Sequence, residues 1–245
     1  MSSSRKSGML AGIFFVLAAI ASIPALALYH SVLHDPRYIV GSGPDTQVLL
    51  GACCEIVAAI SVIGTATVLF PIIRRQSEGM ALSYVVGRLL EAALIVVGIM
   101  SLLSIVALRQ HAAGAAEGQS ASLITTGKAL VALHNWTFLF GPGLAIGINT
   151  TLLATLMYRS QLVPRTIAVG GLIGGPLVFA SSVAVLFGLY EQTSAVAAMA
   201  AVPVFAWEMS LAGWMIAKGF KPSSTVERPT DSLAFNSRIA TAATY

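Results

Sequence analysis

Apolar residues run along this chain in six long blocks, separated by shorter stretches that hold most of the charged residues. A helix needs about 20 residues to cross a hydrocarbon core of about 30 Å, and each block is long enough. Backbone groups that meet no water must be hydrogen-bonded within their own segment, which favours helices. The pattern therefore predicts six transmembrane helices, within residues 9–29, 48–70, 81–108, 129–158, 166–189 and 195–217.

Composition supports a lipid environment. Of the 245 residues, 56% are hydrophobic and 10% are charged, whereas about 25% are charged in an average soluble domain. We predict an all-α fold, a polytopic membrane helix bundle with six transmembrane helices. The third and fourth blocks exceed the minimum length, so we expect tilt or extension beyond the bilayer. Prolines inside the blocks mark expected kinks, because each leaves a carbonyl without its helical partner; they are Pro24, Pro142, Pro176 and Pro203.

The distribution of Lys and Arg predicts the orientation in the membrane. Counting alternate sides of the helices, ten of the 14 basic residues fall on the side of the N-terminus and three on the other, while Arg88 lies within a block. By the positive-inside rule, both termini are expected to be cytoplasmic. The net charge of +4 thus reflects the orientation of the helices in the membrane, and we expect no nucleic-acid partner. The ten are Arg5, Lys6, Arg74, Arg75, Arg159, Arg165, Lys218, Lys221, Arg228 and Arg238, and the three are Arg37, Arg109 and Lys128.

The two ends of the chain differ from its centre. Arg5 and Lys6 precede an apolar run that reaches Ala25-Leu26-Ala27, a combination that resembles a signal peptide whose cleavage would leave five helices. The run is longer than a typical apolar region of about 7 to 15 residues, which favours an uncleaved helix. Because residues 222–245 are polar, we predict a single transmembrane domain over 1–221 followed by a disordered cytoplasmic tail.

The absence of several sequence motifs narrows the chemistry. The chain has no Walker glycine loop, no His-Glu-x-x-His and no Gly-x-Ser-x-Gly. Its three aspartates lie outside the apolar blocks, which excludes an Asp-rich intramembrane site for magnesium and a diphosphate. The only cysteines, Cys53 and Cys54, are adjacent and match no metal or redox spacing. We therefore predict neither a metal site nor a cofactor.

Four charged residues interrupt the apolar blocks: Glu55, Arg88, Glu91 and Glu208. A charge at the centre of a membrane helix costs about 2.5 to 3.5 kcal/mol, so these residues are expected to face the bundle interior. Arg88 and Glu91 are three residues apart, share a helix face and should form a salt bridge. Counting about 1.5 Å per residue places Glu208 level with Arg88 and Glu55 nearer the outer surface, at the depth of His134.

These residues define a candidate site for a ligand or for protons. We predict that the three glutamates border one cavity with His134, close to a break in the fourth helix at Gly141-Pro142-Gly143. Three carboxylates against one guanidinium would leave two surplus negative charges, so either one or two glutamates are protonated or a cationic ligand completes the site. The structural alternative is a network that holds three helices in register. The candidate residues are Glu55, Arg88, Glu91, His134, Asn135 and Glu208.

Short motifs in the later blocks carry a family resemblance. They are residues 87–92 (GRLLEA), 133–135 (LHN), Tyr158-Arg159-Ser160 with Pro164-Arg165, and Trp207-Glu208 followed by Trp214 and Lys218-Gly219-Phe220. In these motifs, above all the Arg-x-x-Glu element of the third helix, the chain resembles a family of uncharacterised bacterial six-helix integral membrane proteins, a domain of unknown function. The resemblance covers helices two to six. It implies a single-domain, multi-pass protein of the bacterial cytoplasmic (inner) membrane with no assigned activity.

Three classes of function are compatible with these observations. In the first, the Glu/Arg/His site binds or transports a small amphipathic, hydrophobic or cationic ligand, or protons. In the second, a membrane-embedded enzyme acts on a lipid or isoprenoid, with one glutamate as general acid and another carboxylate as base. In the third, the chain is a structural or regulatory membrane subunit, which needs no pocket. Membrane lipids are the expected partners in each case.

Overall fold

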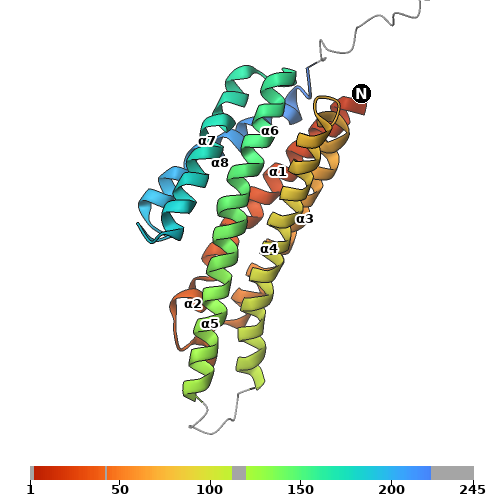
Figure 1. Ribbon diagram of the computed structural model, residues 1–245. Helices are drawn as coiled ribbons and strands as arrows, with labels where there is room; N and C mark the ends of the chain where they lie inside the picture. Colours follow the sequence, from red (N-terminus) through yellow and green to blue (C-terminus); the bar gives the residue numbers. More distant parts are fainter. Residues whose placement is uncertain (1–2, 42, 112–119, 222–245) are drawn as a thin grey trace, which may run out of the picture.

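The computed structural model describes residues 3–41, 43–111 and 120–221, and the regular elements in these ranges are all helices (Figure 1). Six spans are long and apolar enough to cross a membrane, which confirms the helices predicted from the sequence. The predicted tail, residues 222–245, lies outside the described residues. The elements are α1 (Ser3–Leu28), α2 (His30–His34), η1 (Tyr38–Val40), α3 (Asp45–Ile73), α4 (Glu78–His111), α5 (Ser120–Phe138), η3 (Leu139–Ala145), α6 (Ile146–Ser160), α7 (Arg165–Leu186) and α8 (Ala195–Ala217).

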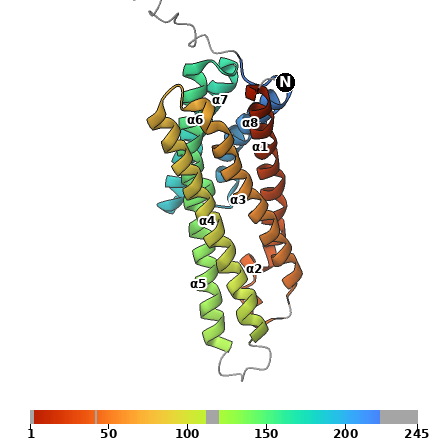
Figure 2. The ribbon, with the colours of Figure 1, turned by 90° about the vertical axis from the view of Figure 1, so that its right-hand side faces the viewer.

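The spans pack as a closed bundle in which α1 contacts both α3 and α8. Each later span packs against the one that follows it in the chain, and α8 returns to α1. Gly219, just after α8, lies against Arg5 at the start of α1, so both ends of the described chain meet at one end of the bundle (Figures 1 and 2). We call this the terminal end and the opposite one the far end. That the terminal end is cytoplasmic stays a prediction.

Two spans are much longer than the others. α4 has 34 residues and the continuous span Ser120–Ser160 has 41, which correspond to about 51 Å and about 62 Å of helix. A hydrocarbon core of about 30 Å cannot contain them upright. Figure 2 shows α4 and α5 extending at the far end well past α7 and α8. The extra length expected of these two spans is confirmed.

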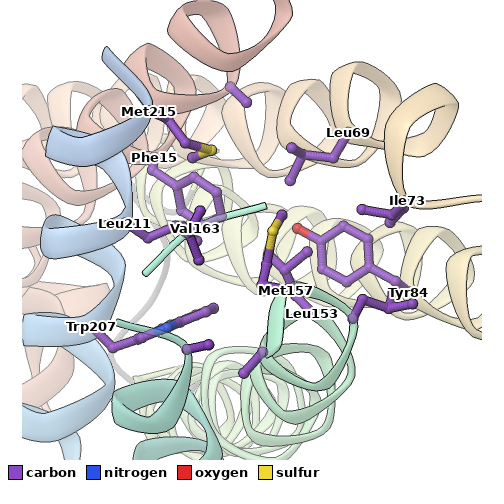
Figure 3. Packing of buried hydrophobic residues seen from close by; sticks show 14 of the residues in the cluster. Phe15, Leu69, Ile73, Tyr84, Leu153, Met157, Val163, Trp207, Leu211 and Met215 are labelled. Atoms are coloured by element: carbon purple, nitrogen blue, oxygen red, sulfur yellow. The ribbon is translucent and has the colours of Figure 1, made fainter. Parts of the chain in front are cut away.

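Most buried apolar side chains form two clusters, one toward each end of the bundle, and a small third cluster contains Ala59, Val62 and Ala92. At the terminal end, Phe15 of α1, Tyr84 of α4 and Trp207 of α8 point into one cluster with residues of α3 and α6 (Figure 3). At the far end, Tyr29 and Ile39 pack with residues of α3 and α4. Both clusters consist of fully or nearly fully buried side chains. The buried charged residues lie between these two clusters, beside α1.

Small residues let α7 approach its neighbours closely. Gly170 and Gly174, like Gly171 and Gly175, have the Gly-x-x-x-Gly spacing that is typical of close helix packing. A Cβ on Gly171 would collide with the Trp207 ring, and one on Gly174 would lie 2.8 Å from the backbone nitrogen of Val204. Ser194 caps the start of α8, and its side chain accepts a hydrogen bond from the Ala197 amide at 3.3 Å. Packing and capping thus fix where α8 lies and which face it turns inward.

Candidate functional site

The Arg88 guanidinium is the centre of an ion network inside the bundle. Its Nη1 donates to both carboxylate oxygens of Glu91 at 3.1 Å, and its Nη2 donates to Oε1 of Glu208 at 3.4 Å. α4 carries Arg88 and Glu91 on one face, and α8 brings Glu208 beside them. Arg88 and Glu91 are each only 3% exposed. The predicted salt bridge is confirmed, and we call these three residues the central cluster.

Three further side chains hold the central cluster in place. Tyr84, one turn before Arg88, accepts a hydrogen bond from the guanidinium Nε at 3.3 Å. The Phe15 ring of α1 faces the guanidinium, with 5.5 Å between Cζ and the ring centroid, a cation–π distance. Asn149 of α6 donates from Nδ2 to Oε2 of Glu91 at 2.8 Å. Glu91 therefore accepts three hydrogen bonds, and its charge is fully paired by the protein.

A second polar group lies toward the far end. Tyr29, directly after α1, donates from its hydroxyl to Oε2 of Glu55 on α3 at 3.1 Å. The His134 ring packs edge-on against the Tyr29 ring, with centroids 5.7 Å apart. Nδ1 of His134 lies 3.4 Å from the Gly98 carbonyl oxygen, so the tautomer protonated at Nδ1 donates to it. We call Tyr29, Glu55 and His134 the far-end cluster.

One cavity of about 300 Å³ connects the two clusters. The three glutamates, Arg88 and His134 all line it, and the remaining wall is mainly apolar. Residues of α1 from Phe15 to Leu26, together with Tyr29 directly after this helix, line one side of the cavity, and Phe205 of α8 also lines it. A concave, mostly apolar space with a few convergent polar groups is the usual form of a small-molecule site.

The cavity lies beside a break in the long span formed by α5, η3 and α6. Residues Leu139–Ala145 are π-helical around Pro142, as the Gly-Pro-Gly sequence suggested. The side-chain amide of Gln192, in the loop between α7 and α8, reaches this break. Its nitrogen can donate to the Asn135 carbonyl oxygen at 3.3 Å, and its oxygen can accept from the Leu139 amide at 3.2 Å. Gln192 thus takes the place of one helical hydrogen bond and attaches the loop to the broken helix.

The structure places five of the six candidate residues around this cavity and the sixth elsewhere. Asn135 lines a separate cavity of about 230 Å³ together with Asp35 and Lys128. Its neighbour Trp136 is exposed. Sequence reasoning missed Tyr29, Tyr84 and Phe15, which contact the charged groups directly and complete the site. That the cavity binds a ligand or protons stays a prediction.

The fold and the site define a multi-pass helical membrane protein with a charged cavity inside its bundle. The chain belongs to the family described as domain of unknown function (DUF4386), whose model matches residues 10–219. The match includes every residue of the central and far-end clusters. Comparisons with curated proteins and with solved structures gave no match.

Proposed function

We propose that this chain is a bacterial inner-membrane protein that binds a small cationic ligand with an apolar part, and that the cavity between the two clusters is the binding site. The supporting observation is the imbalance of charge around one cavity. Glu55, Glu91 and Glu208 line it, whereas Arg88 is the only Lys or Arg among its lining residues. A cation supplies the missing positive charge.

Carboxylate oxygens that accept no hydrogen bond also support a cationic ligand. In the described part of the chain, Oε1 of Glu55 and Oε2 of Glu208 accept no hydrogen bond, although the other oxygen of each does. Both side chains line the cavity. An ionised carboxylate in a mainly apolar space is unfavourable unless it is paired. A protonated primary amine, which carries three donors, can pair with either of these acceptors.

The apolar part of the ligand follows from where the cavity meets the surface. Ile23 and Leu26 of α1 and Phe205 of α8 line the cavity and are exposed on the outside of the bundle. Figures 1 and 2 both show α8 beside α1 at the terminal end and diverging from it toward the far end. On this proposal, a ligand enters sideways from the lipid, with its alkyl part against these three residues and its charged group inside.

Calorimetric titration of the purified protein in detergent tests the proposal, with empty micelles as the blank. The probes are octylamine and octanol, which share an alkyl chain but differ in charge. We expect octylamine to bind at least about tenfold more tightly than octanol. At least one of Glu55→Gln and Glu208→Gln should weaken octylamine binding, and the double variant should weaken it about tenfold or more. Glu78→Gln, at an exposed residue at the start of α4, should not weaken it. Equal affinity for the two probes, or no effect of either cavity substitution, would overturn the proposal.

A further inference from the structure

The central cluster and the far-end cluster lie at different depths along the cavity. His134 of the far-end cluster contacts the carbonyl oxygen of Gly98 on α4. Glu91 of the central cluster lies seven residues earlier on the same helix. Seven helical residues span about 10 Å, so the centres of the two clusters are separated by about that distance. Tyr29 follows α1 directly, so the far-end cluster lies close to the end of that membrane span.

An apolar section separates the clusters. On α4, Ile95 lies between Glu91 and Gly98 and lines the cavity. On α3, Ala58 and Val62 line the cavity on the side of Glu55 that leads toward the central cluster. The cavity therefore has polar groups at both ends and an apolar middle. A ligand with charge at one end only leaves the polar group at the other end without a partner.

The surplus negative charge is divided equally between the two ends. In the central cluster, the Arg88 guanidinium is shared by two carboxylates, which leaves one negative charge when both are ionised. In the far-end cluster, Glu55 is bonded to the neutral hydroxyl of Tyr29, and no Lys or Arg of the described residues forms a salt bridge with it. Each end thus carries one unpaired carboxylate charge.

We propose that the ligand of this cavity is a linear dication, with an amine at each end of an apolar chain about 10 Å long. This inference rests on the proposed function and specifies the ligand class. One ammonium group pairs with Oε1 of Glu55, and the other pairs with Oε2 of Glu208. The alkyl chain lies against Ala58, Val62 and Ile95, and the net charge of the cavity and its ligand becomes zero.

The test compares α,ω-diamines of different length with the monoamine used above, by calorimetric titration of the full chain. Diaminooctane, whose extended length matches the separation of the clusters, should bind at least about tenfold more tightly than octylamine. Diaminobutane is too short to reach both carboxylates and should lose this advantage. Comparing these amines on the unaltered protein tests the dication proposal even if a variant does not fold.

The variants assign each amine to its end of the cavity. Glu55→Gln and Glu208→Gln should each reduce the affinity for diaminooctane to about that for octylamine, and the double variant should bind diaminooctane no better than octanol. If octylamine binds and diaminooctane binds no better, or if affinity does not depend on chain length, the dication is rejected and the proposed function stands. If neither amine binds, both are rejected.

Discussion

Replacing Arg88 by methionine is the most direct perturbation of the charged site, because methionine keeps much of the volume and removes the charge. The substitution abolishes three hydrogen bonds to carboxylates, two to Glu91 at 3.1 Å and one to Glu208 at 3.4 Å. It leaves both carboxylates inside the bundle without a cation. Removing one member of a buried ion pair costs about 3 to 5 kcal/mol, and we expect Arg88→Met to lie in this range.

A double-mutant cycle separates two contributions to the free energy of unfolding: the lost interaction between Arg88 and Glu91, and the cost of leaving the Glu91 carboxylate buried without a cation. Glu91→Gln keeps the volume of the side chain and an oxygen that can accept from Asn149. The double variant Arg88→Met/Glu91→Gln should therefore be more stable than Arg88→Met alone, although it carries one more substitution. Glu208→Gln should cost the least, because its contact is longer and its side chain is 15% exposed.

Reversible unfolding in mixed micelles, with increasing fractions of a denaturing detergent, measures these differences. Tryptophan fluorescence is a suitable signal, since Trp207 is buried next to Glu208. A free energy of unfolding for Arg88→Met within about 1 kcal/mol of the unaltered protein would refute the reasoning, because that is the range of an exposed ion pair. The reasoning would also be refuted if the double variant were less stable than Arg88→Met by as much as Glu91→Gln alone destabilises the unaltered protein.

Three further predictions concern packing, pH dependence and topology. Gly171→Ala should lower the free energy of unfolding by about 1 to 3 kcal/mol, because its Cβ would collide with the Trp207 ring. The matched control is Gly213→Ala, which has no atom within 4 Å of the added Cβ and should be neutral or stabilising in the same assay. Burial raises the pKa of Tyr38 from 10.0 to about 12, so its contribution to stability is complete below pH 10 and is lost as the pH rises toward 12; the unfolding temperature should fall more steeply over this interval than it does for Tyr38→Phe. An alkaline phosphatase fused after Tyr245 should stay inactive because the positive-inside rule places the tail in the cytoplasm, and strong activity would contradict that orientation.

The salt bridge could be predicted from two simple features of helix geometry, the spacing of residues on one face and the rise per residue. Spacing of three residues puts Arg88 and Glu91 on one helix face, and counting residues from the ends of the spans puts Glu208 at the same depth. Tyr84 could have been found by the same rule, since it precedes Arg88 by four residues. The contact between Tyr29 and Glu55 joins residues 26 apart on different elements, and no periodicity indicates it.

The placement of Asn135 shows the limit of reasoning from depth alone. His134 and Asn135 lie at nearly the same depth, but consecutive helical residues point about 100° apart. His134 faces Tyr29 and is buried, so Asn135 is turned away and lines the other cavity. The Gly-Pro-Gly sequence indicated the break in the long span. It did not indicate that Gln192, from a loop more than 40 residues later, completes the hydrogen bonding there.

The cavity also bears on the alternative in which the charged residues serve only to hold helices in register. Such a network is complete once its groups are paired, and protein interiors are otherwise densely packed. Pairing accounts for Arg88 and Glu91, whose hydrogen bonds are all internal. It does not account for Glu55, which has no basic partner among the described residues and lines the same cavity as Glu208. Each of these two carboxylates has one oxygen that accepts no hydrogen bond in the described part of the chain, and an ionised carboxylate in a mainly apolar cavity is unfavourable unless it is paired. The cationic ligand that we propose would pair with carboxylates of both clusters, whereas a register role accounts only for the central cluster.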